Sequence, residues 1–288
     1  MANPFTSISC SIRYDNARLI TWTMMPGANY PEDFTLRVEN SRAGGPWQVI
    51  AEGLQNSCAF VDSRKRNYNK TLDDYYRVRY QSASTGEDYV SPITEAGNHK
   101  AFPFSADAEN IVKQVETQMN ISGCTGKLLK KKVWGVHCPL CVDFAGQETV
   151  NEHCPRCLGT GIDGGFFPGI PLSIIKDSIE TQEQPSQIGF LQGETVKGRC
   201  IAYPWINYGD VWCEDNTNKR YVVAQATPAA SFKTTALVYS IVMNQVEYTD
   251  VMHSHEADER VVETGAWQSE EASNMPKHTG WDEVLSGL

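Results

Sequence analysis

The sequence has no long apolar run, and it has fewer basic than acidic residues. Its 288 residues contain 25 Lys and Arg against 35 Asp and Glu, which gives a formal net charge of −10 at pH 7. No stretch approaches the roughly 20 apolar residues that a membrane-spanning helix needs. The acidic balance also disfavours a protein that holds phosphate backbones through a basic face. We therefore expect no membrane partner, and nucleic acid is a disfavoured partner.

The sequence also begins without the pattern of a secretory signal. Residues 1–10 carry neither a basic stretch nor an apolar core, so we expect a reducing compartment in which cysteines stay as thiols. Nine cysteines are many for such a chain. Five of them are expected to be reduced, mostly buried, small apolar side chains: Cys10, Cys58, Cys124, Cys200 and Cys213.

The other four cysteines form two Cys-x-x-Cys pairs. Cys138 and Cys141 are followed, after twelve residues, by Cys154 and Cys157. This spacing is typical of four thiolates around one tetrahedral ion, zinc above all, with iron as the other metal that such a set accepts. Because all four protein ligands are sulfur, no position is left for water or substrate. The predicted Zn²⁺ is therefore structural rather than catalytic.

Other interpretations of these four cysteines are weaker. Two disulfides need an oxidising compartment, and a thioredoxin-like redox pair needs one Cys-x-x-Cys at the start of a helix in a βαβ unit. His137 and His153 each precede a pair and are able to replace a cysteine as ligand, but we expect both to serve as local hydrogen-bond donors. Gly159 and Gly161 allow backbone amides to turn toward the sulfurs of the second pair.

Residues 1–97 have the pattern of a small antiparallel sandwich. Seven segments rich in β-forming residues are separated by turns: 8–12, 18–23, 35–40, 47–52, 57–61, 75–82 and 89–94. Trp22, together with the run from Leu72 to Tyr80, resembles a fibronectin type III domain, with Tyr76 in the place of its corner tyrosine. The resemblance implies a spacer or adhesion module with Trp22 in its core, and such a fold specifies no activity.

Residues 98–132 are expected to be a linker with one amphipathic helix. The helix begins at the caps of 105–107 and runs to about Met119, with apolar residues at helical spacing. Its apolar stripe needs a partner, which the flanking domains or a neighbouring subunit can supply. After it, the lysines between Lys127 and Lys132 are expected to lie on a solvated strand edge. Contact with a phosphate backbone is the alternative.

Residues 133–171 are the zinc-ribbon-like segment, and residues 172–252 are a small β-domain that we expect to be barrel-like. Strands of this domain are expected at 195–202, 210–214, 220–226 and 236–242, whereas 172–190 is weakly patterned. The glycine- and aromatic-rich stretch 161–171 should fold back over the metal site. Loss of the metal is expected to free the segment 133–170 while the N-terminal domain stays folded.

Residues 253–288 are an acidic tail that we expect to be extended on its own, because its apolar residues are sparse. Trp267 and Trp281 are the anchors with which the tail would dock on a neighbouring subunit. A purely solubilising tail is the alternative.

Two stretches resemble structural proteins of tailed-phage virions. The segment from Trp134 to Ile170, in which the paired knuckles are followed by Gly-Gly-Phe-Phe-Pro, resembles the middle of a neck or connector component. Residues 208–212, followed by 219–223, resemble the small β-barrels of head-closure and connector proteins. The second cysteine pair also resembles one repeat of a chaperone zinc motif, but that family carries several repeats.

The resemblance implies a structural virion protein of the neck or head–tail connector, assembled in the host cytoplasm and located in the virion. Its partners would be other virion proteins, such as connector, tail or neck subunits, and it would form a homo-oligomeric ring or occur in several copies. A tail or baseplate component, or an intracellular zinc-ribbon adaptor that binds protein or nucleic acid, is the alternative. We find no activated nucleophile, open metal position or phosphate loop in the sequence, so we expect no enzyme.

Overall fold

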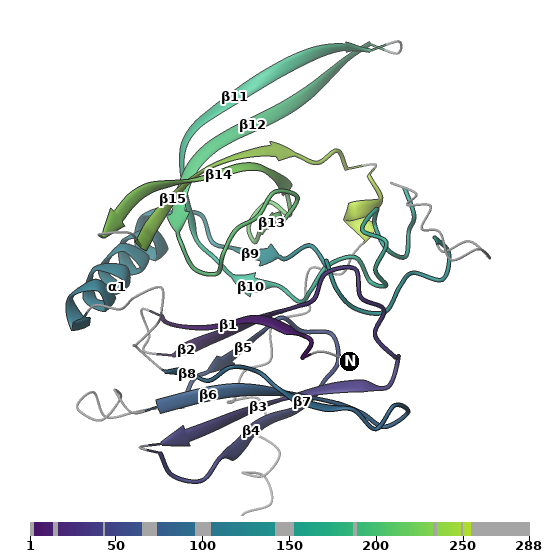
Figure 1. Cartoon of the computed structure of the whole chain (residues 1–288). Helices are drawn as coiled ribbons and strands as arrows, with labels where there is room; N and C mark the ends of the chain where they lie inside the picture. Colours follow the sequence, from purple (N-terminus) through teal and green to yellow (C-terminus); the bar gives the residue numbers. More distant parts are fainter. Residues whose placement is uncertain are drawn as a thin grey trace, which may run out of the picture.

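The structure is a computed structural model of the chain, and it describes residues 3–13, 17–42, 44–64, 74–95, 105–141, 153–186, 189–232, 235–248 and 250–254. Over these ranges the protein is mainly β, with one α-helix and three antiparallel sheets. Figure 1 shows two halves: strands β1 to β8 form one, and the helix with β9 to β15 forms the other. The predicted acidic tail lies outside the described residues from 255 onward.

The N-terminal strands form two facing sheets. One has the order β1-β2-β5, and the other has the order β4-β3-β6-β7, with β8 also paired to β6. The seven predicted segments all overlap these strands, and the last of them is divided into β7 and β8. The bounds are β1 (Phe5–Ile12), β2 (Arg18–Met24), β3 (Phe34–Arg42), β4 (Gln48–Leu54), β5 (Ala59–Asp62), β6 (Asp74–Ser82), β7 (Asp88–Val90) and β8 (Thr94–Glu95).

Alternation along β6 places one face of the strand in the sandwich core. Tyr76, Val78 and Tyr80 are buried while the residues between them are half-buried, as the two-residue period of a strand requires. Trp22 of β2 belongs to the same core, as expected. The hydroxyl of Tyr76 donates a hydrogen bond of 2.8 Å to a carboxylate oxygen of Asp62. The polar end of this buried ring is therefore satisfied by a side chain inside the core.

The C-terminal half contains a seven-stranded sheet with the order β10-β9-β13-β14-β15-β12-β11. The expected barrel is wrong: within the described residues the sheet is open, because β10 pairs only with β9 and β11 pairs only with β12. The bounds are β9 (Gly126–Leu129), β10 (Ile170–Pro171), β11 (Ile174–Ser186), β12 (Gly189–Ile201), β13 (Val211–Glu214), β14 (Arg220–Phe232) and β15 (Thr235–Gln245).

The outer part of β11 and β12 is a two-stranded ribbon. These strands pair with each other from Ile174↔Cys200 to Ser186↔Gly189, whereas β12 pairs with β15 only over 195–201. Beyond that register the ribbon projects from the sheet, as Figure 1 shows. The stretch 172–190, to which the sequence pattern assigned no element, therefore contains the edge strand β11.

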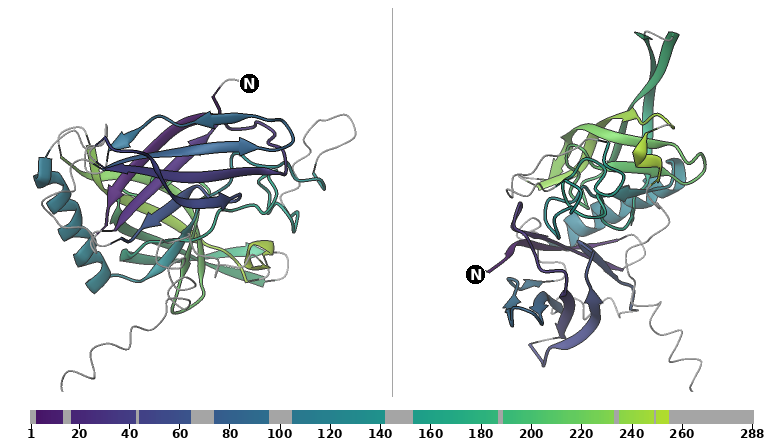
Figure 2. Two further views of the ribbon diagram at one scale, coloured as in Figure 1. Left: turned by 90° about the horizontal axis from the view of Figure 1, so that it is seen from below. Right: turned by 90° about the vertical axis from the view of Figure 1, so that its right-hand side faces the viewer.

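Helix α1 (Ser105–Ser122) finds its apolar partner within the chain. Val112 and Met119 are buried in the same core as Leu128 of β9 and Trp212 of β13. Figure 2 shows the helix lying beside this half of the molecule. No helix in the described ranges has the length and apolar character needed to span a membrane.

The prediction that the lysine cluster lies on a solvated strand edge is wrong. Strand β9 lies between β10 and β13, and Lys127 and Lys132 are 9% and 2% exposed. Lys130 forms an ion pair with the carboxylate of Asp210, and the ammonium of Lys132 donates to the carbonyl of Asp163 at 2.6 Å. These charges are buried because acceptors from distant parts of the chain meet them.

The segment between β9 and β10 packs into the N-terminal core. Trp134, Phe167 and Ile170 belong to the buried cluster of the sandwich. The Trp134 ring lies 4.8 Å from Phe167, 6.2 Å from Tyr30 and 6.5 Å from Phe34, measured between ring centroids. The four-cysteine segment and the sandwich therefore share a core, and the expectation that they respond independently to loss of metal needs revision.

Candidate metal centre

The four predicted cysteines converge at one point. The Sγ atoms of Cys138, Cys141, Cys154 and Cys157 all lie within 4.8 Å of one another, and all four residues are buried. They form their own buried cluster, separate from the two main cores. In the described part of the chain, this is the group of cysteine, histidine and acidic side chains that can hold a metal ion.

The sulfur positions fit a tetrahedral ion. Metal–sulfur bonds of about 2.3 Å in a tetrahedron place the sulfurs about 3.8 Å apart. The Cys138–Cys154 and Cys141–Cys157 sulfurs are 3.9 Å and 3.5 Å apart. A disulfide requires an S–S distance of about 2.05 Å, and all four cysteines are reduced. The geometry therefore matches a shared ion and excludes disulfides between these pairs.

Backbone amides favour the thiolate form of Cys154, the first cysteine of the second pair. The N–H groups of Cys157 and Arg156 donate to the sulfur of Cys154 and lower the pKa of this thiol to about 6. A metal ligand must be a thiolate, so Cys154 is prepared for binding. Burial raises the pKa of Cys138 to about 12, although the N–H of Leu140 opposes it. A metal cation would offset the free-energy cost of burying Cys138 as a thiolate.

Glycines and short turns build the two knuckles. Gly159 and Gly161 have φ values of 77° and 79°, a region that residues with a Cβ rarely adopt. Leu158, between Cys157 and Gly159, also has a positive φ of 51°. The N–H of Cys138 donates to the carbonyl of Gly161 at 2.8 Å, which joins the first pair to the end of the second. The predicted role of the two glycines in turning the chain here agrees with these angles.

The stretch after the second pair does fold back, and its two phenylalanines point into different clusters. Phe166 packs with Leu129 and Leu158 in a small buried cluster, whereas Phe167 packs on Trp134 in the sandwich core. Arg156 and Asp163 are bridged by two hydrogen bonds of 2.5 and 3.0 Å across the turn. The segment is thereby fixed to both halves of the molecule.

The other histidines and cysteines considered in the sequence lie outside the four-cysteine cluster. His137 and His153 are not part of the converging group. Of the five other cysteines, Cys124 is half-buried and the rest are buried, and all five are reduced, as expected: Cys10, Cys58, Cys124, Cys200 and Cys213. Burial raises the pKa of Cys58 and of Cys200 to about 12, so these two thiols are inert at neutral pH.

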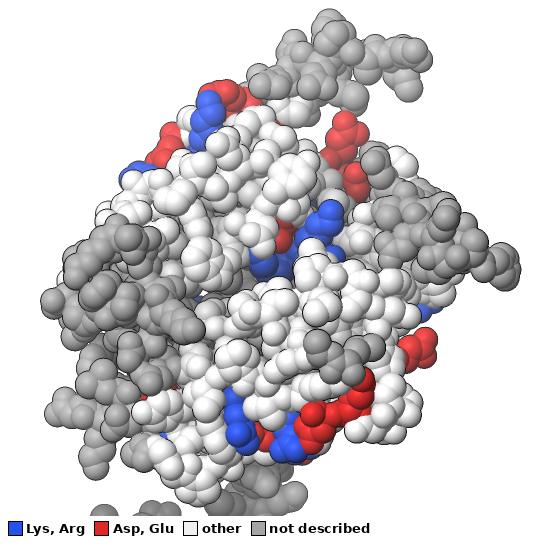
Figure 3. Space-filling model, viewed as in Figure 1, with Lys and Arg blue, Asp and Glu red and all other residues white. Residues whose placement is uncertain are grey.

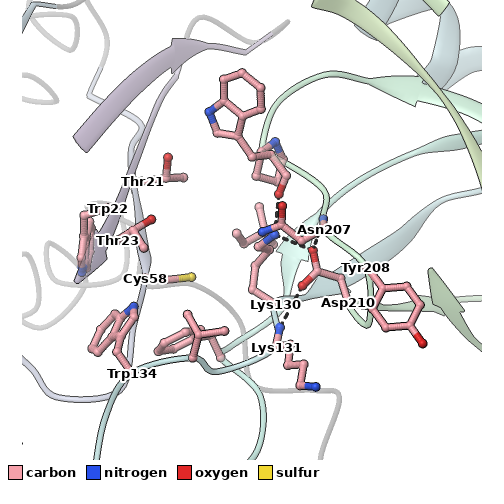
Figure 4. Close-up of a pocket in the computed structure, with 15 residues that line it drawn as sticks. Thr21, Trp22, Thr23, Cys58, Lys130, Lys131, Trp134, Asn207, Tyr208 and Asp210 are labelled. Atoms are coloured by element: carbon pink, nitrogen blue, oxygen red, sulfur yellow. Dashed lines mark hydrogen bonds and ion pairs between the residues drawn. The ribbon is translucent and has the colours of Figure 1, made fainter. Parts of the chain in front are cut away.

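A second feature, a cavity between the two halves, was not predicted. It has a volume of about 120 Å³. Figure 4 shows Thr21, Thr23 and Cys58 on one side, facing Lys130 and Asp210 on the other. The lining residues come from five separate stretches of the chain, so no local sequence motif predicts the cavity.

Comparison of the chain with protein-family models and with curated proteins finds no match. The four-cysteine cluster and the surfaces around it are therefore the features that indicate its chemistry.

Proposed function

We propose that the protein is a structural subunit in which one Zn²⁺, held by Cys138, Cys141, Cys154 and Cys157, fixes the junction of two β-rich halves. The observation that carries this proposal is the buried four-sulfur cluster with near-tetrahedral spacings. Four sulfur ligands complete the coordination of zinc and leave no open position for a reacting group. Zinc is preferred over iron because it imposes no geometry of its own and suits a purely structural site.

The metal-binding part has a direct test. Metal analysis of the purified chain should give about one equivalent of zinc. Changing all four cysteines to serine should abolish binding, whereas Cys200→Ser, which removes a buried thiol outside the cluster, should leave the zinc content unchanged. Zinc retained by the fourfold variant would contradict the assignment, and one equivalent of iron would replace zinc as the metal.

We further propose that this subunit belongs to a tailed-phage virion, at the neck or head–tail connector. Support comes from the two stretches of resemblance and from the arrangement of the N-terminal strands. Three strands in one sheet face the β4-β3-β6-β7 sheet, which suits a fibronectin type III-like spacer. The β11–β12 ribbon adds a second argument. Two-stranded ribbons are marginally stable alone in water, so a neighbouring subunit that packs on it accounts for its length.

Mass spectrometry of purified virions is the test of this location. The protein should be present in several copies per particle, together with connector or tail subunits. If the protein is absent from particles and is recovered only from infected-cell lysate, the virion assignment is contradicted. That result would favour the intracellular adaptor and would leave the zinc site untouched.

A further inference from the structure

The cavity between the two halves has an apolar floor. Trp134, Phe167 and Ile170 line it, and each of these residues is at most 3% exposed. Its volume of about 120 Å³ is comparable with an apolar cavity of roughly 150 Å³ that accepts benzene. The cavity therefore has room for about one aromatic ring.

Large apolar side chains stand exposed around the same cavity. Val133, Trp205 and Tyr208 line it and are 44%, 44% and 78% exposed. The Trp205 carbonyl accepts a hydrogen bond of 2.5 Å from the ammonium of Lys130, and the Trp205 ring lies 5.3 Å from Tyr203. Exposed apolar groups that are held in place beside an apolar hollow are typical of a docking surface.

One positive charge at the cavity has no counter-charge among the residues that the structure describes. Lys130 is paired with Asp210, whose carboxylate also accepts from the backbone N–H of Asn207 at 2.7 Å and of Lys131 at 2.9 Å. The side-chain ammonium of Lys131, by contrast, pairs with no carboxylate within the described ranges, and Figure 4 shows it directed away from Asp210. Figure 3 shows Lys and Arg side chains gathered at the junction of the two halves. The best ligand for this surface is an aromatic ring next to a carboxylate.

We propose that this ligand is the chain's own C-terminal segment 281–285, with the ring of Trp281 in the cavity and Asp282 or Glu283 paired with Lys131. Residues 255–288 lie outside the described part of the chain, and they carry eight carboxylates against Arg260 and Lys277. An acidic segment is attracted to an uncompensated lysine.

The spacing within the tail selects one of its two tryptophans. Trp281 is followed at once by two carboxylates, whereas the nearest carboxylates after Trp267 are three and four residues away. The ring of Trp281 and the carboxylate of the next residue can therefore contact the cavity and Lys131 at the same time. Reach is no obstacle, because the 27 residues from Ser254 to Trp281 span up to about 90 Å when extended. This inference depends on neither the zinc nor the virion location.

The experiment uses the full chain with Trp281→Ala, which empties the cavity without changing its lining. A fluorescent peptide of residues 277–288 should bind this variant about tenfold more tightly than it binds the wild-type chain, whose own tail competes. A peptide carrying Trp281→Ala should lose about tenfold in affinity. Adding Lys131→Gln to the chain should weaken binding several-fold at low salt, and the effect should shrink as salt rises.

Two controls make the result specific. Lys197→Gln, at an exposed lysine of β12 that is 49% exposed, should not change peptide affinity. A peptide of residues 262–273, which contains Trp267, should bind more weakly than 277–288. Equal binding of the two peptides, or equal binding of the peptide to the wild-type and Trp281→Ala chains, would overturn the proposal.

Photo-cross-linking then places the segment. With benzoylphenylalanine in place of Trp281 in the full chain, cross-links should map to 130–134 or 204–210. Cross-linked monomer would identify the chain's own tail as the occupant, and cross-linked dimer would identify the tail of a second copy. Cross-links confined to other parts of the chain would refute the assignment of the cavity.

Discussion

Removing the metal should destabilise the N-terminal sandwich, although no cysteine of the cluster lies within it. The link is Trp134, which follows β9, stands four residues before Cys138 and is 1% exposed in the sandwich core. When the ion is removed by a strong chelator, the segment that carries Trp134 and Phe167 loses its anchor. Both rings then become free to leave the core.

The size of the effect follows from the Trp134 ring. A buried Trp removes about 200 Å² from water, worth about 5 kcal/mol at 25 cal/mol per Å² as an upper bound. Truncation of a buried Trp to Ala costs about 3–5 kcal/mol in measured cases. Since about 1.4 kcal/mol is a factor of ten, the opening equilibrium of the sandwich should rise between about 100-fold and a few thousand-fold.

Hydrogen exchange measures this equilibrium strand by strand. Amides of β3 and β6 lie far from the cysteines in sequence, and they should lose protection by this factor after chelation. The matched control is Trp134→Ala with the metal bound. It should show the same loss at β3 and β6, and chelation of that variant should add less than about 1 kcal/mol at these strands. Unchanged protection of β3 and β6 in a chain shown to be metal-free would refute the shared-core argument.

Three further outcomes test other parts of the structure. Tyr76→Phe leaves a buried carboxylate at Asp62 without one donor, so urea denaturation should show a loss of about 1–3 kcal/mol; no loss would mean that the bond contributes nothing. Burial by itself would raise the pKa of Glu214. The hydrogen bonds from Lys176, at 2.7 Å, and from Thr217 outweigh burial, so the pKa of Glu214 lies below its usual value of 4.5. Its ionised form therefore contributes stability above about pH 4.5, and this stability is lost as the pH falls. In the E214Q variant, the melting temperature should depend less on pH in this acid range. Gly126→Ala would bring a Cβ within 2.4 Å of a backbone oxygen, whereas Gly193→Ala meets nothing within 4 Å; calorimetry should show a loss of about 1–3 kcal/mol for the first and little change for the second.

Local patterns were sufficient for the strands of the sandwich, the helix and the cysteine cluster. Alternation along β6 and the spacing of the two cysteine pairs are written in adjacent residues, and both depend on short-range geometry. The ribbon was harder to predict. Ile179 of β11 is 56% exposed, and a strand without a buried face has no reason to alternate between polar and apolar residues.

The lysine cluster and the cavity depend on long-range contacts that the sequence does not show. Four lysines in six residues predict a solvated edge, whereas in the structure Asp210 and the Asp163 carbonyl, both distant in sequence, accept from the ammonium groups of Lys130 and Lys132. The cavity likewise joins residues near Thr21 and Cys58 to others near Lys130 and Trp205. No periodicity links such positions, because their proximity is created by the packing of the two halves.

Strand β9 also determines when the protein can fold during synthesis. Its residue Leu128 pairs with Ile170 on one side and with Trp212 on the other. A nascent chain must therefore release residues up to the end of β13 before this strand has both of its neighbours. Until then one row of its backbone donors and acceptors is open to pairing with other chains. Contacts of such long sequence separation slow folding, so fragments that end before Val211 should aggregate while chains that extend past β15 do not.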